Sequence, residues 1–131
     1  MVKLKDKVAI ITGGGTGIGK AISLALVNEG AAVVVAARTL SRLEEVVKDI
    51  KSRGGKAKAI QTDISDQEQV KRMVAQTIDE FGQIDILVNN AARGTFNNAN
   101  AVDMNLDEWH DSLAINLTGA MFCAREVLKY M

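Results

Sequence analysis

Short apolar runs alternate along the chain with segments in which apolar residues recur every three or four positions. The apolar runs cover residues 8–11, 31–37, 56–62 and 84–89, and the third is the weakest of them. Runs of this length that are rich in β-branched residues are typical of strands buried on both faces of a sheet. The segments between them have the periodicity of helices with one buried face. The pattern therefore predicts strands and helices in alternation.

Capping and glycine signals delimit the predicted helices. These signals are two capping boxes, Ser41-x-x-Glu44 and Ser65-x-x-Glu68, and three glycine stops, Gly30, Gly54 and Gly82. A polar loop over residues 93–103 follows the fourth strand, and a long helix is expected from Asn105 to the end. Helical spacing assigns the following residues to buried faces: Ile18, Ile22, Ala25, Leu26, Leu40, Leu43, Val47, Ile50, Val70, Met73, Val74, Thr77 and Phe81. The last helix is apolar at Trp109, Leu113, Leu117, Ala120 and Ala124, and we expect it to lack the next strands on which this face would pack.

The order of these elements predicts a doubly wound α/β fold. Strands that recur with a helix after each one are typical of a parallel sheet with helices on both faces. Four strands in the order 3-2-1-4 would form the first half of a Rossmann-like sheet. No linker or change of composition divides residues 1–131, so we assign them to a single domain. Strands 1 and 4 are then neighbours, and a ligand is expected in the crevice at their carboxyl ends.

A glycine-rich turn directly follows the first strand. Five of the seven residues at 13–19 are glycine. Between a buried strand and a helix, such a turn gathers backbone N–H groups at the positive end of the helix dipole, and the missing Cβ atoms let a pyrophosphate come close. A purely structural turn is the alternative. The P-loop pattern fails, because Ala21 stands where Mg²⁺ coordination requires a hydroxyl.

Four motifs together resemble the short-chain dehydrogenases/reductases. They are TGGGTGIG at 12–19, Asp63 after the third strand, NNAA at 89–92 and Asn116 in the last helix. The first fits the family pattern T-G-x-x-x-G-x-G, so the resemblance favours a dinucleotide over ATP or GTP. The segments GGGTGIGKAI and AARTLSRLEEV look most similar to reductases of 3-oxoacyl and enoyl thioesters. The resemblance implies an oxidoreductase that transfers hydride between nicotinamide and a carbonyl or alcohol substrate.

The resemblance also implies roles for individual residues. Asp63 is expected to meet the adenine amino group, residues 89–92 to brace the sheet and line the nicotinamide ribose, and Asn116 to support a proton relay. A helix-initiating aspartate and a polar residue that kinks a helix are the alternatives for Asp63 and Asn116. Ala92 stands where the family has glycine, which predicts a wider turn. The expected cofactor-binding residues are Gly13, Gly15, Thr16, Gly17, Ile18, Gly19, Arg38, Thr39, Asp63, Ile64, Asn89 and Ala91.

The choice of cofactor is expected to depend on the end of the second strand. In doubly wound folds an Asp or Glu about 20 residues past the glycines binds the 2′-hydroxyl of NAD. Here that position is Arg38, followed by Thr39, and residues 31–42 contain no carboxylate. A guanidinium pairs with the 2′-phosphate of NADP, so NADP(H) is preferred to NAD(H). Thr16 is neutral where NADP-preferring members often have a base, so Arg38 would act nearly alone; a solvated arginine is the alternative.

The catalytic serine, tyrosine and lysine of the family are not found in these residues, because every serine lies in or near a predicted helix and no Tyr-x-x-x-Lys occurs. A phenol with a pKa of about 10 needs a neighbouring cation to act at neutral pH, which is the role of the family's Tyr-x-x-x-Lys. The one tyrosine, Tyr130, is expected to pack at the end of the last helix. The apolar fourth strand would also be left as an exposed edge. We therefore expect a truncated chain that is inactive alone, the cofactor-binding half of a protein twice as long. A nucleotide-binding module without catalysis and a non-binding fragment are the alternatives.

The composition of the chain limits its possible binding partners and its cellular compartment. Sixteen basic and sixteen acidic residues balance, so no electrostatic footprint for nucleic acid or an anionic membrane is present. No apolar run approaches the ~20 residues of a membrane span, and no signal peptide precedes Val8. The single Cys123 and the absence of a leader predict a cytoplasmic protein. No cluster has metal-ligand spacing. The resemblance implies a small-molecule substrate and a homo-oligomer formed through residues 105–131.

Overall fold

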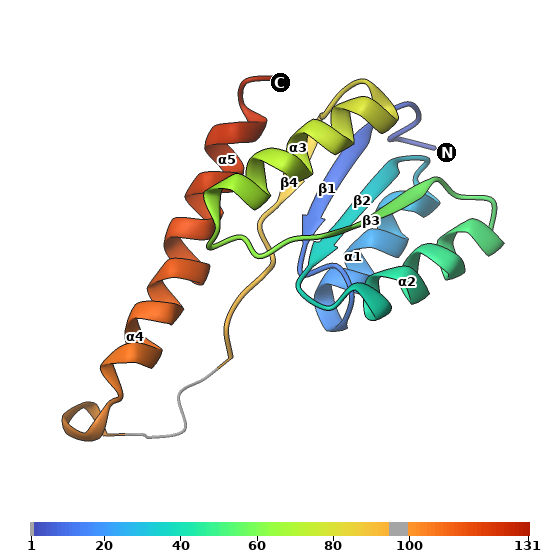
Figure 1. The fold of residues 1–131 in the computed structure, drawn as a ribbon. Coiled ribbons are helices and arrows are strands. Elements are labelled where there is room, and N and C mark those ends of the chain that lie inside the picture. The colour runs from blue at the N-terminus through green and yellow to red at the C-terminus, as the bar shows by residue number, and fades with distance from the viewer. Residues whose placement is uncertain (1, 95–99) are drawn as a thin grey trace.

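The four predicted strands form one parallel sheet in the computed structural model, which describes residues 2–94 and 100–131 (Figure 1). The strands are β1 (Val8–Thr12), β2 (Ala32–Ala37), β3 (Ala57–Gln61) and β4 (Ile86–Val88). Their order across the sheet is β3-β2-β1-β4, and every neighbouring pair is parallel. This order confirms the first half of a doubly wound α/β fold. It places β1 beside β4, with the carboxyl ends of both strands at the same edge.

Helices follow the first three strands and make up the C-terminal part of the chain. They are α1 (Gly17–Asn28), α2 (Leu40–Ser52), α3 (Gln67–Phe81), α4 (Leu106–Leu113) and α5 (Ala120–Val127). A 3₁₀ turn at Ala101–Asp103 precedes α4, and a π-helical turn at Ala114–Gly119 joins α4 to α5. The predicted long helix is therefore present, with a π-helical segment in its middle. The predicted polar loop over 93–103 lies partly outside the described residues.

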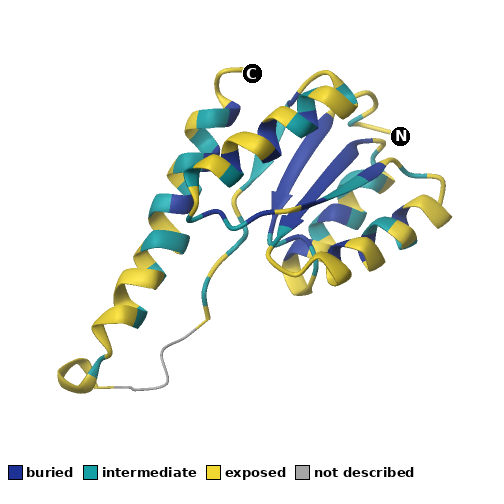
Figure 2. Ribbon diagram, in the orientation of Figure 1, coloured by how far each residue is buried: buried dark blue, intermediate teal, exposed yellow. Residues whose placement is uncertain are grey.

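The sheet is buried on both faces, as its apolar strands predict. On one face Ile10, Val34 and Ile60 pack against α3 and α5. On the other face Ile11 and Val35 pack against α1 and α2. Figure 2 shows β1 and β2 buried along their length. Burial of these side chains is the main favourable contribution to folding, and it fixes the strand ends at which the loops begin.

Both predicted capping boxes are wrong. The N-cap of α2 is Thr39, which makes no side-chain capping bond, so Ser41 lies inside the first turn. The N-cap of α3 is Asp66, whose carboxylate accepts hydrogen bonds from two backbone N–H groups of the first turn. Ser65 instead precedes the cap. Serine and aspartate are equally good N-caps, so the spacing of the box could not choose between two adjacent candidates.

The helix stops are confirmed, but several predicted buried positions are wrong. The glycine stops have the positive φ of the left-handed region, at Gly30, Gly54 and Gly82. Ile18, Ala25 and Leu40 are exposed, although helical spacing assigned them to buried faces. α1 instead turns Gly19 and Ser23 towards the sheet. Small residues face the sheet there because the helix approaches the glycine turn closely.

The C-terminal helix is exposed along most of α4 (Figure 2). Trp109, Leu113 and Leu117 are exposed, as expected for a helix that lacks further strands to pack on, because no element of the described chain covers them. α5 does pack on the sheet, through Cys123 and Val127. β4 forms an edge of the sheet, as predicted. Within residues 2–94 and 100–131, none of the helices combines the length and apolar character needed to cross a bilayer.

Asp85 joins the amino ends of β1 and β4. Its Oδ2 accepts hydrogen bonds from the backbone N–H of Val8 at 2.9 Å and from Gln83 Nε2 at 2.6 Å. The hydrogen bond from Val8 is the main cause that lowers the pKa of Asp85 below its ordinary value. A carboxyl whose pKa is lower in the folded state stabilises the fold above its unfolded pKa. That contribution is lost as the pH falls through the folded pKa.

We expect Asp85→Asn to lower the free energy of unfolding at pH 7 and to have a smaller effect once the pH falls below the ordinary carboxyl pKa of about 3.9. Urea unfolding at pH 7 and at pH 3 measures the difference. Asp79→Asn, at an exposed position on α3, is the matched control and should have little effect at either pH. An effect of Asp85→Asn that does not change with pH would contradict the role of the carboxylate charge.

Candidate functional site

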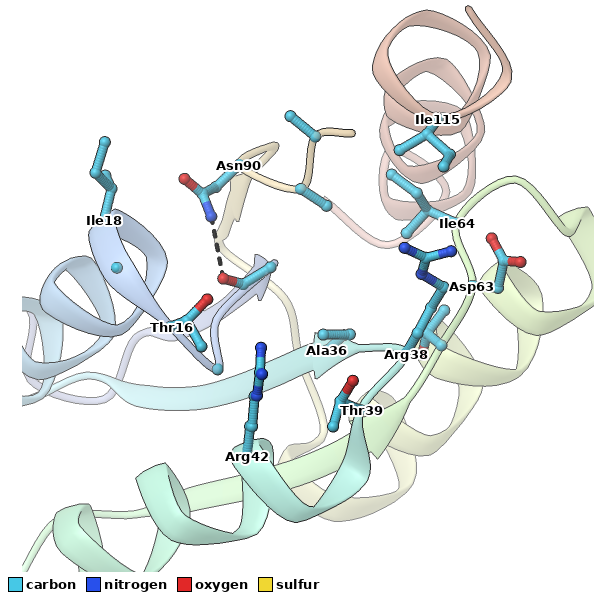
Figure 3. Close-up of a pocket in the computed structure, with 17 residues that line it drawn as sticks. Thr16, Ile18, Ala36, Arg38, Thr39, Arg42, Asp63, Ile64, Asn90 and Ile115 are labelled. Carbon is cyan, nitrogen blue, oxygen red and sulfur yellow. Dashed lines mark hydrogen bonds between the residues drawn. The ribbon is translucent and has the colours of Figure 1, made fainter. Parts of the chain in front are cut away.

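A cavity of about 460 Å³ lies at the carboxyl ends of the four strands (Figure 3). Each strand contributes residues at or after its carboxyl end: the glycine turn after β1, residues 36–39 and Arg42 at and after the end of β2, residues 62–64 after β3 and residues 90–92 after β4. Ile115, from the π-helical turn, closes another side. In doubly wound sheets, ligands bind at this edge, at the point where the strand order reverses. The cavity is therefore the candidate functional site.

Ten of the twelve predicted cofactor residues line this cavity. The ten are Gly13, Gly15, Thr16, Gly17, Ile18, Arg38, Thr39, Asp63, Ile64 and Ala91. The other two lie outside the lining. Gly19 is buried beneath the glycine turn. Asn89 Nδ2 donates a hydrogen bond to the backbone oxygen of Ala120 at 3.3 Å, so this side chain ties the end of β4 to α5.

The hydroxyl of Thr12 holds the loop after β4 against the end of β1. Thr12 Oγ1 donates a hydrogen bond to the backbone oxygen of Val88 at 3.3 Å. It accepts hydrogen bonds from the backbone N–H groups of Asn90 at 3.1 Å and Ala91 at 3.0 Å. The ladder between β1 and β4 ends one residue earlier, at Ile11. This hydroxyl takes the place of further ladder bonds after Val88, where β4 ends.

Asn90 fastens the same loop to the glycine turn. Its Nδ2 donates hydrogen bonds to the backbone oxygens of Thr12 at 3.1 Å and Gly13 at 3.2 Å. A Cβ at Gly19 would overlap the Gly13 oxygen and lie 2.5 Å from Asn90 Nδ2. The first turn of α1 thus approaches both segments too closely for any side chain at Gly19. This close contact, and not exposure to a ligand, accounts for the glycine at that position.

The two helices that begin at the cavity have free N-termini. Thr16 and Thr39 are the N-caps of α1 and α2, and neither makes a side-chain capping bond. Neither first turn contains an acidic residue. By contrast, Asp66 and Asn105 cap α3 and α4 through their side chains. Free N–H groups at a helix N-terminus attract anions, so the cavity presents two sets of backbone donors suited to phosphate groups.

Two arginines and one aspartate give the cavity its formal charge. They are Arg38, Arg42 and Asp63. Both arginines are exposed, and neither guanidinium has an ion pair or hydrogen bond with the described residues. The balance of charge is therefore positive, with two planar groups of donors available to an anion. The glycine cradle, the free helix N-termini and this charge together fit a dinucleotide with its diphosphate.

Asp63 has a structural partner as well as a place in the cavity lining. Its Oδ1 accepts hydrogen bonds from the backbone N–H of Ser65 at 3.0 Å and from Ser65 Oγ at 2.6 Å. Its own N–H donates to Gln69 Oε1 at 2.9 Å. One carboxylate oxygen thus orients the start of α3. This geometry agrees with the helix-initiating interpretation, and it leaves Oδ2 without a hydrogen bond to the described residues.

Asn116 lies in the π-helical turn and outside the cavity lining. Its Oδ1 accepts a hydrogen bond from the backbone N–H of Arg93 at 2.8 Å, and its Nδ2 donates to Ser112 Oγ at 3.3 Å. Arg93 is held at a second point by an ion pair with Asp111 at 2.9 Å. Asn116 therefore anchors the segment that follows β4 to the long helix. π-Helical turns frequently mark functional sites, which agrees with a role near the cavity.

Two residues of this region, Thr12 and Arg42, were given no role of their own from the sequence. Asn90 lies in the segment 89–92 that was expected to brace the sheet, although it was not among the predicted binding residues. The hydrogen bonds that Thr12 and Asn90 make to each other's segments show that both shape the cavity. Arg42, which lines the cavity, follows Thr39 by three residues and lies in the first turn of α2. That position was the available signal, because a helix that begins at a strand end presents its first turn to the site.

The remaining reactive side chains lie away from the cavity. Burial raises the pKa of the Cys123 thiol to about 11, so this thiol is protonated and unreactive at neutral pH. His110 is exposed on α4. Tyr130 is exposed after α5, so its predicted packing role is wrong for the described structure. Among the residues described, no three His, Cys, Asp or Glu side chains lie close enough to hold a metal ion.

The parallel sheet, the glycine turn and the cavity at the sheet edge define a doubly wound α/β protein of the nucleotide-binding class. The family model described as short chain dehydrogenase matches residues 7–131. The chain therefore belongs to the short-chain dehydrogenase family of oxidoreductases.

Individual relatives agree with this assignment. A 3-oxoacyl-[acyl-carrier-protein] reductase of Synechocystis sp. is 38% identical over 132 residues, which cover 100% of this chain and 53% of that protein. A short-chain type dehydrogenase/reductase from Mycobacterium marinum has 38% identity and a TM-score of 0.92 over 97% of this chain and 51% of that one. A hydroxysteroid dehydrogenase from Escherichia coli has 31% identity and a TM-score of 0.89 over 98% of this chain and 53% of that one. The chain spans about half the length of each of these relatives.

Thr12→Val tests the hydroxyl that joins the glycine turn to the loop after β4. The substitution keeps the shape of a fully buried side chain, but it leaves the N–H of Ala91 without its partner. We expect a loss of about 1–3 kcal/mol in the free energy of unfolding, measured by urea denaturation. Thr77→Val is the matched control, because the buried Thr77 hydroxyl donates only to Met73 O within α3. Equal losses in the two variants would show that the Thr12 hydroxyl has no special role.

Proposed function

We propose that this chain is the cofactor-binding half of an NADP(H)-dependent oxidoreductase. The observation that carries the proposal is Arg38, which follows β2 with its guanidinium free on the cavity. NAD-binding folds of this kind use a carboxylate at this point for the 2′-hydroxyl, and residues 31–42 contain none. A guanidinium there pairs with the 2′-phosphate that distinguishes NADP.

The remaining lining residues suit the other parts of the cofactor. The diphosphate fits over the glycine turn, where the first N–H groups of α1 are free. Adenine fits beside Asp63 and Ile64, where the second carboxylate oxygen of Asp63 is available to an amino group. The nicotinamide ribose fits along residues 89–92, on the loop that Thr12 positions. When bound, NADPH supplies hydride to a carbonyl carbon, and NADP⁺ accepts it from an alcohol.

The substrate that we propose is a carbonyl compound of the 3-oxoacyl thioester type. The 3-oxoacyl-[acyl-carrier-protein] reductase of Synechocystis sp. supports this, at 38% identity over the whole chain. An enoyl thioester is the alternative, since the glycine and β2 segments look similar in both kinds of reductase. The reaction needs a proton donor, and the family's Tyr-x-x-x-Lys is not found in the 131 residues. This chain would contribute Asn116 to the proton relay, held in place by Arg93.

A nucleotide-binding module without catalysis is the second candidate function. It is favoured by the cavity, whose lining comes from all four strand ends within this chain. Both candidates require dinucleotide binding, so they share the binding test below. Hydride transfer by a longer protein, in which this chain is joined to a segment that carries a Tyr-x-x-x-Lys, would separate them, because only the oxidoreductase interpretation predicts it.

We also propose that the face formed by Trp109, Leu113, Leu117 and Met121 pairs with a second copy of the chain. These four apolar side chains are exposed on the long helix at 105–131. Apolar patches of this kind commonly mark contacts between proteins. Sedimentation should then give twice the monomer mass of 14.1 kDa. A monomer at micromolar concentration would contradict the pairing.

Arg38→Asp tests the cofactor preference. We expect the unmodified chain to bind NADPH at least about tenfold more tightly than NADH, the scale of one charge-assisted contact, as measured by isothermal titration. Arg38→Asp should reverse this preference, because a carboxylate repels the 2′-phosphate and accepts from the 2′-hydroxyl. Lys48→Asp is the control for charge, because Lys48 is exposed on α2 and does not line the cavity. An unchanged preference in Arg38→Asp would remove the argument for NADP.

A further inference from the structure

We propose that Arg42 is a second specificity-determining residue, which binds the 2′-phosphate of the cofactor together with Arg38. This inference rests on the proposed NADP(H) site. It changes the expectation that Arg38 would act nearly alone because Thr16 is neutral. The missing positive charge on the glycine turn is supplied instead from the first turn of α2.

The position of Arg42 carries the proposal. Arg42 is the third residue of α2 and lines the cavity. Figure 3 shows its side chain rising from α2 into the space between Thr16 and Thr39. In the same view, Arg38 extends from the end of β2 towards Ile64. The two guanidinium groups therefore enter the cavity from different elements.

The contacts of Arg42 keep its stem beside the glycine turn. A Cβ at Gly15 would lie 3.3 Å from Arg42 Cβ, so the two segments are in close contact. Glycine at this position leaves space above the backbone of the turn. Arg42 makes no ion pair with the described residues. By contrast, Arg53 at the other end of α2 is paired with Asp49 at 3.0 Å. The Arg42 side chain is thus held beside the glycine turn at its Cβ, and its guanidinium has no partner among the described residues.

The chemistry of the 2′-phosphate favours two guanidinium groups. A phosphate monoester carries up to two negative charges and three terminal oxygens, and one planar guanidinium satisfies two oxygens at most. The free N–H groups at the uncapped start of α2 add favourable charge on the same side. The adenosine ribose of a doubly wound fold lies at the end of β2, which is where Thr39 and Arg42 are found. The diphosphate lies at the start of α1 instead. Arg42 is therefore assigned to the 2′-phosphate.

Two small ligands separate this assignment from a general role in nucleotide binding. Adenosine 2′,5′-bisphosphate carries the 2′-phosphate and ADP does not, so affinities of the full 131-residue chain for both are compared by isothermal titration. We expect Arg42→Gln to lower the affinity for the bisphosphate about tenfold and to change the affinity for ADP less than about twofold. Arg42→Lys keeps the charge but loses the planar fork, and should give an intermediate loss. Lys48→Gln, at an exposed position on α2 outside the cavity, should change neither affinity.

Each other outcome overturns the assignment in a distinguishable way. Equal weakening of both ligands by Arg42→Gln would place Arg42 on the adenosine or the 5′-phosphate, which both ligands share, and weakening of ADP alone would place it on the second phosphate of the diphosphate. No change with Arg42→Gln, together with a large loss with Arg38→Gln, would refute only the role of Arg42 and leave the proposed function standing. An unmodified chain that binds neither NADPH nor the bisphosphate would refute the proposed function as well. Circular dichroism of each variant shows whether a loss of affinity reflects unfolding. If Arg42→Gln is unfolded, the affinities for the two ligands are compared with Arg42→Lys instead.

Discussion

The hydroxyl of Thr12 is the contact on which the geometry of the site depends. A parallel sheet opens a crevice where two neighbouring strands separate, and β1 and β4 separate directly after Ile11 and Val88. One buried hydroxyl bonds to three backbone groups of the departing chain. Asn90 returns two hydrogen bonds to the first strand and the glycine turn. Because such bonds reinforce one another in a shielded environment, the two walls of the cavity behave as one unit.

Around the cavity, polar groups remain without hydrogen-bond partners and are available to bind a ligand. The chain caps α3 and α4 with side chains but leaves the starts of α1 and α2 open on the cavity. The guanidinium groups of Arg38 and Arg42 are likewise without partners among the described residues. Uncapped helices and unpaired charges do not favour stability, and such departures are expected at functional sites. The pattern supports a bound anion as the missing partner of all these groups.

The sheet could be predicted from sequence, because strands buried on both faces leave continuous apolar runs and the glycine turn marks the first of them. Details that depend on tertiary contacts could not be predicted from the sequence. Ser65 and Asp66 are adjacent and equally suited to cap α3, so only the folded chain shows which one does. The position of Arg42 in the first turn after a strand end points towards the site, but only the folded chain shows that this residue lines the cavity. The π-helical turn around Asn116 has no local sequence pattern, and its hydrogen bond to the backbone N–H of Arg93 joins residues 23 positions apart.

The most direct test of this account is the amide spectrum of the ¹⁵N-labelled chain during titration with NADPH. A dinucleotide in the cavity predicts saturable shifts at residues 13–19, 38–42, 63–64 and 90–92, with the core of the sheet nearly unchanged. Saturable shifts at 38–42 that are absent with NADH would also support the 2′-phosphate assignment. The absence of saturable shifts, or shifts confined to the exposed face of α4, would contradict the claim that this edge of the sheet is built to bind a dinucleotide.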